Sequence, residues 1–455
     1  MPSTFTSGAA PGALPLVGHA WPLTRRPVDF FASLRAHGDL VEIRLGPSRA
    51  YVPCHPELLR RILLDDRTFD KGGPFFDKAK EFFGNGIGTC PYADHRRQRR
   101  LLQPAFHRNR LESYASVMEK EIADLTGSWR DGQCIDVYPA MKRLTLRTVI
   151  RTLFSAHADA ATVEGLRHAF ETVLDGFLQW LFLPEALRRL PLPANRRHRQ
   201  AMAYLHNTVN RIVGDYRRDG EDHGDLLSMF ITARDDEGTG LDDTEIQEQV
   251  IALLTGGSET VAITLTWALY LLSRHPDVHR RLQEEVDAVL GGRPARWSDV
   301  PALDYTERVV RETLRIDTPG WLFARRTTRP VELDGVRLPA GAIVLVSPPA
   351  VHRNADVYRR PLDFDPDRWL PESRSALPPG AFTAFSAGAR KCIGDAYGMV
   401  ESTMALATII SQWNIECAPG TDLRPKPLVA IHYPRRLNIR VTRRAAGFES
   451  QALSA

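Results

Sequence analysis

Apolar residues recur every three or four positions along most of the chain, which is the spacing of one face of an α-helix. This period predicts helices over residues 99–106, 111–129, 138–154, 163–182, 195–216, 243–274, 300–316 and 394–413. The pattern over 243–274 is the longest, with Asp242 or Asp243 placed to cap its start and Pro276 just beyond its end. At ~1.5 Å rise per residue, such a helix would run through the whole molecule.

Patterns typical of β-strands are few and short. Residues 40–45 and 49–53 predict a hairpin, and further strands are expected over 331–338 and 343–346. Residues 70–94 are rich in glycine and phenylalanine without a clear period, which predicts a long irregular loop that could line a pocket. Residues 1–28 are rich in proline and glycine and predict an extended arm. The fold class is therefore mostly α with a minor β region, in one large domain over residues 1–455.

The composition of the chain argues against several classes of protein function. The chain has 455 residues, 43% of them hydrophobic, and a net charge of +4 that does not indicate a nucleic-acid binder. Five widely spaced cysteines favour neither a disulfide framework nor a metal knuckle, so we expect a reducing cytoplasm. We find no secretory signal and no unbroken apolar run long enough to span a bilayer, so a soluble protein without a membrane anchor is expected.

One short stretch carries specific chemistry. Phe385, Gly388, Arg390, Cys392 and Gly394 form the pattern F-x-x-G-x-R-x-C-x-G immediately before the last predicted helix. A cysteine there can be kept ionised by the amide groups and the positive dipole end of the helix that follows. The glycines allow the backbone to turn tightly. The alternative is a buried structural cysteine that precedes a helix.

This stretch resembles the haem-binding signature of the cytochrome P450 family, and further family motifs follow in the same order along nearly the whole chain. The resemblance implies the cytochrome P450 fold with a buried haem b, whose iron takes Cys392 as its axial thiolate ligand. Phe385 would shield the sulfur and Gly394 would lie beneath the macrocycle. The haem propionates would be held by His95, Arg99, Arg325 and Arg390.

A second motif is Glu312-Thr-Leu-Arg315, followed by residues 364–369 with Arg368. Charges three positions apart share one helical face. The motif resembles the buried Glu-Arg-Arg cluster of the family. Because a buried ion pair costs about as much desolvation as it returns, we expect it to hold the segment under the cysteine loop rather than to take part in chemistry.

A third motif lies within the longest predicted helix. Gly256 and Gly257 precede Ser258, Glu259 and Thr260, although each glycine costs a helix up to about 1 kcal/mol against alanine. The motif resembles the oxygen-activation groove of the family, in which Thr260 and Glu259 would form the acid–alcohol pair that delivers protons. The alternative is a helix kink packed against a neighbour.

The resemblance implies a monomeric monooxygenase that uses O2 and electrons from a ferredoxin and its reductase. An acidic ferredoxin would be drawn to Arg390, Lys391 and the Arg96–Arg100 run, although such runs are more often solvated helix faces. The candidate substrate pocket is apolar, which suits a lipophilic small molecule. It comprises Phe75, Phe76, Phe177, Trp180, Leu254, Trp321 and Leu322, with Phe82, Phe83, Ile251 and Pro319 as further candidates.

Several longer segments, among them residues 10–20, 95–107 and 364–372, resemble actinobacterial sesquiterpene oxidases within the family. That resemblance predicts hydroxylation, and further oxidation, of a cyclic terpene. Three alternatives stay open. They are a fatty-acid or polyketide hydroxylase of the same fold, a peroxide-driven enzyme, which would usually lack the Glu259-Thr260 pair, and a non-catalytic haem sensor.

Overall fold

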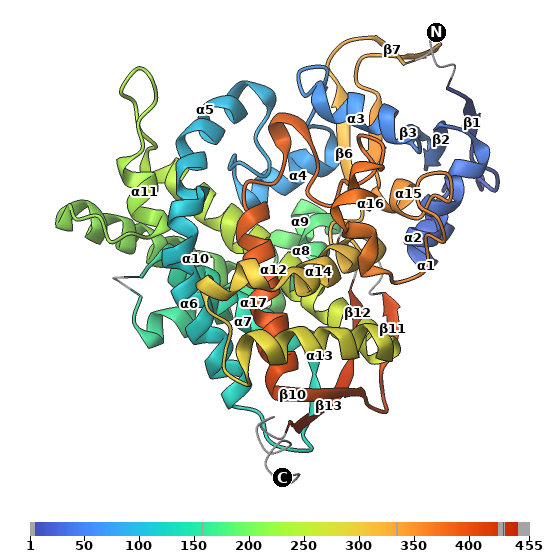
Figure 1. Cartoon of the computed structure of the whole chain (residues 1–455). Coiled ribbons are helices and arrows are strands. Elements are labelled where there is room, and N and C mark those ends of the chain that lie inside the picture. The colour runs from blue at the N-terminus through green and yellow to red at the C-terminus, as the bar shows by residue number, and fades with distance from the viewer. Residues whose placement is uncertain (1–4, 156–157, 334, 426–430, 432, 445–455) are drawn as a thin grey trace, which may run out of the picture.

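The computed structural model describes residues 5–155, 158–333, 335–425, 431 and 433–444. A large helical body forms most of the molecule, and a smaller β-rich part lies beside it near the N-terminus (Figure 1). The longer helices are α5 (Tyr92–Leu102), α6 (Arg108–Gly127), α7 (Val137–Leu153), α8 (Ala160–Phe182), α10 (Pro193–Asp219), α12 (Asp243–Arg274), α13 (Pro276–Leu290), α14 (Asp304–Ile316) and α17 (Asp395–Gln412).

The remaining helices are short. They are α1 (Ala20–Arg25), α2 (Pro27–Ser33), α3 (Pro56–Leu64), α4 (Pro74–Phe83), α9 (Glu185–Arg189), α11 (Leu226–Thr232), α15 (Pro348–His352) and α16 (Pro371–Ser375). Among the described residues, five short 3₁₀-helices lie between them, η1 (Leu34–His37), η2 (Gln103–Phe106), η3 (Trp297–Ala302), η4 (Pro366–Trp369) and η5 (Gly388–Arg390).

The main sheet has the strand order β1-β2-β3-β9-β6-β4. Its strands are β1 (Ser7–Ala9), β2 (Leu40–Leu45), β3 (Ser48–Pro53), β9 (Ile343–Val346), β6 (Phe323–Thr327) and β4 (Phe69–Asp70). Three smaller sheets pair β10 (Trp413–Cys417), β13 (Asn438–Arg443) and β5 (Cys134–Asp136), then β11 (Asp422–Pro425) with β12 (Pro434–Arg436), and β7 (Val331–Leu333) with β8 (Val336–Leu338). The predicted hairpin is confirmed as β2 and β3, paired antiparallel from Leu40↔Pro53 to Leu45↔Ser48.

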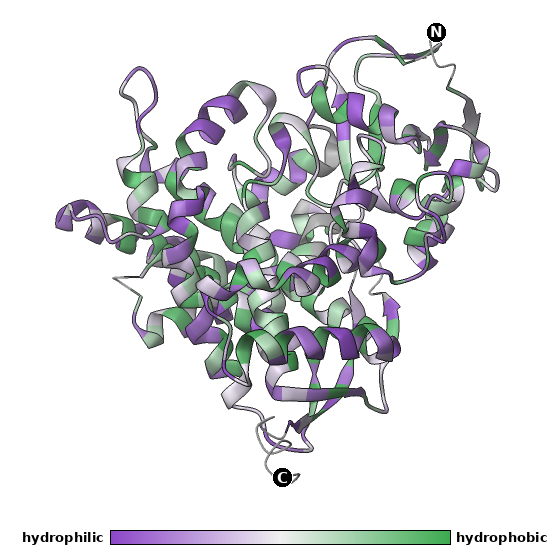
Figure 2. Ribbon diagram, viewed as in Figure 1, coloured by the Kyte–Doolittle hydropathy of each residue, from purple (hydrophilic) through white to green (hydrophobic). Residues whose placement is uncertain are grey.

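Helix α12 is the central element of the helical body, and it packs against α7, α14 and α17. Its start is fixed by a capping box in which Asp242 accepts from the Glu245 amide at 2.8 Å and Glu245 accepts from the Asp242 amide at 3.1 Å. This helix is long and apolar enough to span a membrane by composition, but 72% of its most apolar window is buried inside the fold. Packing against the other helices therefore accounts for its apolar character (Figure 2).

The predicted long helices are confirmed to within a few residues at most ends, whereas two predictions for irregular segments are wrong in part. The segment 70–94 contains α4, because Pro74 occupies the first helical turn and Phe76 and Ala79 are buried three positions apart. Helix α5 begins at Tyr92, seven residues before the predicted start, since its polar first half buries His95 and Gln98. The arm over 1–28 is not extended throughout, as α1 lies within it.

The Glu312 motif forms the predicted buried cluster beneath the cysteine loop. Arg315 is fully buried and donates to both carboxylate oxygens of Glu312 at 2.7 and 2.8 Å. Its guanidinium also donates to the carbonyls of His352, Pro361 and Asp363. Glu312 in turn accepts from the Asp365 amide, from Arg368 and from the Trp369 indole. The cluster thus joins α14 to the chain around η4, and each charge in it has its partners.

We expect Glu312→Gln to lower the free energy of unfolding by about 3–5 kcal/mol, or to prevent folding, because it leaves the Arg315 charge buried without a counter-charge. Glu307→Gln is the matched control on the same helix. It breaks a partly exposed pair with Arg311 at 2.6 Å, and should cost under about 1 kcal/mol. Denaturant unfolding compares the two, and equal losses would contradict a supporting role for the cluster.

Candidate functional site

A cavity of about 370 Å³ lies between α12 and the start of α17. One wall belongs to α12 and is lined by Ala252, Leu253, Gly256, Gly257, Thr260, Val261 and Thr264. The opposite wall is formed by Phe385, Ser386, Cys392, Ile393, Gly394, Tyr397 and Gly398. Basic residues are also part of the lining, namely Lys71, His95, Arg99, Arg390 and Lys391. No carboxylate is among the lining residues in the part of the chain that the structure describes.

The loop before α17 places Cys392 on the cavity wall. The loop is closed by a hydrogen bond of 2.8 Å from the Cys392 amide to the Phe385 carbonyl. Gly388 has φ +68°, and a Cβ at this position would lie 2.6 Å from the Leu63 carbonyl oxygen of α3. A side chain at Gly388 would therefore push the loop away from its support. This is the physical reason for the first glycine of the motif.

The sulfur of Cys392 is open towards the cavity and crowded by protein atoms elsewhere. Burial raises the pKa of the Cys392 thiol, while the hydrogen bond from the Gly394 amide lowers it. The hydrogen bond within the loop thus offsets only part of the effect of burial on the thiol pKa. A metal cation bound at the sulfur would supply the remaining positive charge, because coordination deprotonates a thiol outright.

Cations crowd one side of the cavity. Burial, together with the neighbouring charges of Arg325 and Arg390, lowers the pKa of Lys71 to about 7. Burial and the charge of Arg390 lower the pKa of Arg325 to about 10. Burial and these cations also lower the pKa of His95 to about 3, and the buried Nδ1 of its neutral ring has no hydrogen-bond partner within the described residues. Such a cluster fits an anion, such as the carboxylates of a haem.

Five residues were predicted to bind the haem propionates or to shield the sulfur, and four of them lie on the cavity wall. His95, Arg99, Arg390 and Phe385 line the cavity, whereas Arg325 is buried behind it and is not part of the lining. Arg390 already donates to the Cys90 carbonyl at 2.7 Å and to Asp70 at 2.6 Å. Lys71 was missed by sequence reasoning. Its only signal was its place at the start of the glycine-rich segment.

The prediction of a basic face that binds ferredoxin is wrong for several of its residues, which are buried or paired with carboxylates. Arg390 is 7% exposed and paired with Asp70, so it cannot present charge to a partner. Arg97 is paired with Asp235 and Glu245, and Arg100 with Asp236. Arg96 and Arg100 remain exposed, as does Lys391, which pairs with Asp395. Two arginines of the run, Arg97 and Arg100, thus form ion pairs that join α5 to the segment before α12 and to the start of α12.

The groove on α12 is created by its glycines. A Cβ on Gly256 would meet no atom within 4 Å, so the missing side chain leaves open space beside the cavity. A Cβ on Gly257 would lie 3.1 Å from Val149 of α7, so this glycine permits close helix packing. The Thr260 hydroxyl is exposed to the cavity and donates to the Gly256 carbonyl at 2.7 Å.

Glu259 does not line the cavity. Its side chain points to α7, where Oε1 lies 2.9 Å from the Lys142 ammonium and Oε2 accepts a hydrogen bond from the Tyr138 hydroxyl. Lys142 also lies 3.8 Å from Asp175, and the Tyr138 ring stacks on Tyr433 at 4.2 Å between centroids. Burial and the nearby carboxylate of Glu259 raise the pKa of Tyr138. Glu259 must therefore leave these partners before it can approach Thr260.

Of the seven candidate pocket residues, the five whose side chains the structure describes are not part of this lining. Leu254 is buried in the main core, and Trp321 and Leu322 pack in the core beneath the N-terminal arm. Phe177 contacts Phe83 at 5.0 Å between centroids, and Phe76 is buried. The side chains of Phe75, Phe82 and Trp180 lie outside the described residues.

The lining residues that sequence reasoning missed include Leu253, Ile87, Val149, Leu314 and Phe323, whereas Pro319, a further candidate, does line the cavity. Leu253 could have been found from the helical period. Positions 253, 256, 257, 260 and 264 share one face of α12, and Leu254 does not belong to that face.

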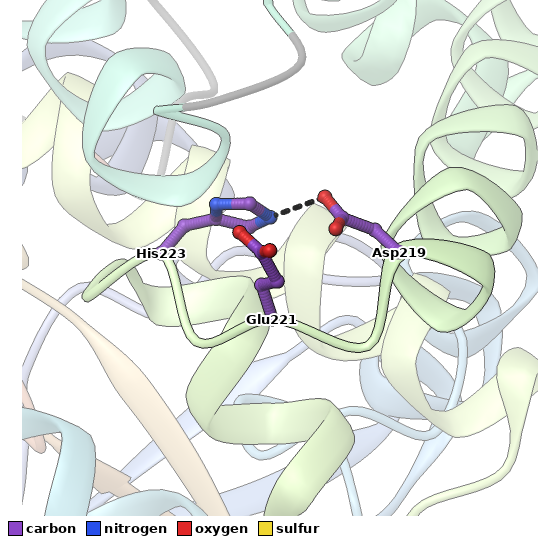
Figure 3. Close-up of side chains that lie close together, drawn as sticks. All are labelled: Asp219, Glu221 and His223. Atoms are coloured by element: carbon purple, nitrogen blue, oxygen red, sulfur yellow. Dashed lines mark hydrogen bonds and ion pairs between the residues drawn. The ribbon is translucent and has the colours of Figure 1, made fainter.

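A second group of possible metal ligands lies away from this cavity, in the loop between α10 and α11. Asp219, Glu221 and His223 place their ligand atoms within 4.8 Å of one another, as Figure 3 shows. The hydrogen bond of 2.8 Å between His223 Nε2 and Asp219 accounts for their approach. None of the three lines the cavity.

Comparisons with known proteins identify the family to which the chain belongs. The cytochrome P450 family model matches residues 9–435. Pentalenene oxygenase of Streptomyces avermitilis is 51% identical over 98% of this chain and 99% of its own length. Cyclooctatin synthase of Streptomyces melanosporofaciens is 48% identical over 93% of each chain. Cyclooctat-9-en-7-ol 5-monooxygenase of the same species is 44% identical over 92% of each.

The fold has solved counterparts as well. The crystal structure of the cytochrome P450DA heme domain superposes with a TM-score of 0.88 at 26% identity, over 97% of this chain and 99% of that one. The cysteine loop, the glycine groove of α12 and the buried Glu312 cluster thus occur in a chain that matches the family over almost its full length. The chain belongs to the cytochrome P450 family and is one of its monooxygenases.

Proposed function

We propose that this monooxygenase binds haem b through a Cys392 thiolate and oxidises a cyclic terpene, in the first place a sesquiterpene. The observation that carries the proposal is the cavity itself, with Cys392 on one wall, Gly256 and Thr260 on the other, and mainly apolar side chains between them. Two relatives that align over nearly the whole chain are named for pentalenene and cyclooctatin. A lipophilic substrate fits such a lining better than a charged one.

The residues present fit the cofactor. Cys392 would hold the iron through its sulfur, and Gly394 keeps the wall beside it free of a side chain. His95, with its unpartnered Nδ1, and Arg99 and Lys71 would hold the propionates. Arg390, which lines the cavity but is paired with Asp70, and Arg325, which does not line it, would add positive charge nearby. When bound, haem would supply the oxidising chemistry, in which O2, two electrons and two protons convert a C–H bond to C–OH and release the second oxygen atom as water.

The chain's own groups then handle protons and water. Thr260 faces the cavity, and its hydroxyl can turn from the Gly256 carbonyl to donate into the groove. Glu259, once released from Lys142 and Tyr138, carries protons from the α7 side to Thr260. Leu253, Val261 and Phe323 exclude water from the substrate side.

Electrons would come from a separate ferredoxin and its reductase. The exposed Arg96 and Lys391 offer the contact charges, and the Lys391 backbone joins the cysteine loop to Arg99 through a hydrogen bond. We further propose that the protein acts as a monomer in the cytoplasm.

The substrate class is tested by optical titration of the ferric holoprotein with pentalenene and with a long-chain fatty acid. A cyclic terpene that fills the apolar cavity should displace water from the iron and shift the Soret band from its low-spin to its high-spin position. Product formation with ferredoxin, reductase and NADPH should follow. A shift with the fatty acid alone would overturn the terpene proposal, and binding without turnover would favour a haem sensor.

The proton path is tested with Glu259→Gln. Product formation should fall by about 10²-fold because the relay loses its acid, while the terpene-induced Soret shift stays unchanged because Glu259 lies outside the cavity. Glu171→Gln is the matched control, since it removes a carboxylate that pairs with Arg167 at 2.6 Å away from the groove. Wild-type turnover in Glu259→Gln would exclude the proposed relay.

A further inference from the structure

The N-terminal arm exposes an unusual group of apolar side chains. Of the ten large hydrophobic side chains that the described residues expose, four lie within eight positions, namely Leu14 (51% exposed), Leu16 (91%), Val17 (48%) and Trp21 (59%). Scattered exposed leucines are ordinary in a soluble protein, but a local group that includes a tryptophan marks an interaction surface.

The arm is held firmly, so its exposed side chains have a fixed direction. His19 is buried, accepts from the Arg44 amide at 2.9 Å and contacts the carbonyls of Ala10 and Pro11 at 3.3 and 3.2 Å. Leu14 and Gly18 exchange two backbone hydrogen bonds of 2.9 Å, which close a tight turn. Figure 1 shows the arm folded along β2 at the edge of the main sheet.

Leu16 lies at the tip of this turn with φ +65°. A leucine rarely adopts this left-handed conformation, which glycine or asparagine adopts at little cost. Backbone strain of this kind persists where the side chain has a role. Here the strained residue is also the most exposed of the large apolar side chains.

Basic residues surround the turn without balancing acids in the arm itself. Residues 1–28 contain no Asp or Glu, and their only charged side chains are Arg25 and Arg26. The Arg25 guanidinium lies 4.4 Å above the Trp21 ring. On the adjoining hairpin, Arg44 and Arg49 are exposed and directly opposite each other, with Glu42 3.4 Å from Arg49 as the nearby counter-charge. Like charges in opposite positions are unfavourable unless an anion lies over them.

We propose that Leu14, Leu16, Val17 and Trp21, with Arg25, Arg44 and Arg49, form an N-terminal patch that binds the surface of an anionic lipid bilayer. Leucine and tryptophan side chains would enter the interface, and the arginines would contact lipid phosphates. This is peripheral contact without a spanning helix. The inference concerns the arm alone and does not depend on which substrate the cavity takes.

A second copy of the chain fits the patch less well. A twofold interface would bring Arg25, Arg44 and Arg49 of two copies together, and the resulting repulsion would oppose association. Four apolar side chains also supply much less than the ~800 Å² that each partner of a stable interface usually buries.

Co-sedimentation of the full-length holoprotein with phosphatidylcholine vesicles, with and without phosphatidylglycerol, tests the proposal. We expect the wild type to bind anionic vesicles at least about tenfold more tightly than the double variant Leu16→Ser/Trp21→Ser. Arg44→Gln/Arg49→Gln should lose about fivefold for each arginine on anionic vesicles and little on neutral ones. Leu362→Ser is the matched control, since Leu362 is 71% exposed outside the patch and should bind as the wild type does.

Binding of the wild type that equals that of Leu16→Ser/Trp21→Ser, or no binding to either vesicle, would overturn the proposal. Light scattering gives the other decisive result, because a wild-type dimer that the double variant abolishes would assign the patch to a second copy. The Soret titration with terpene is read separately without lipid, so failure of one proposal leaves the other standing.

Discussion

The position of one thiol constrains most of this structure. Cys392 lies on the wall of an apolar cavity, where burial disfavours its charge, and in the proposed function it would have to become a thiolate on binding iron. The solution has two parts. The Gly394 amide and the start of α17 supply part of the stabilisation, and a bound metal would supply the rest. Everything beneath the loop keeps that geometry fixed, from the contact of Gly388 with α3 to the buried cluster of Glu312 and Arg315.

The cations lie on a different side of the cavity from the groups proposed to carry protons, and this arrangement suits the proposed reaction. Cations gather on one side, where Lys71 and Arg99 line the cavity and would be available to carboxylates of the cofactor. The groups proposed to carry protons lie on the α12 side, and Glu259 forms an ion pair with Lys142 outside the cavity. The lining between them is mainly apolar. A lipophilic substrate can therefore lie next to the reactive centre without competing for the polar groups.

Local motifs were predictable from the sequence because each depends on neighbouring residues. The cysteine loop, the capped start of α12 and the pairing of Glu312 with Arg315 all follow from short spacings. The pocket lining was not predictable in the same way, since it depends on which helix face turns inward and on contacts between distant segments. Leu253 lines the cavity and Leu254 does not, although they are adjacent. Arg390 matches the motif, but its pairing with Asp70 becomes evident only once β4 is in place.

Iron X-ray absorption of the ferric holoprotein tests the central claim most directly. The account predicts one sulfur bound to iron in the wild type and in Cys90→Ser, which removes the other buried thiol near Lys71 and Arg390. It predicts no sulfur bound to iron in Cys392→Ser, or loss of haem from that variant alone. A sulfur ligand that persists in Cys392→Ser, or disappears in Cys90→Ser, would contradict the assignment of Cys392 and the function built on it.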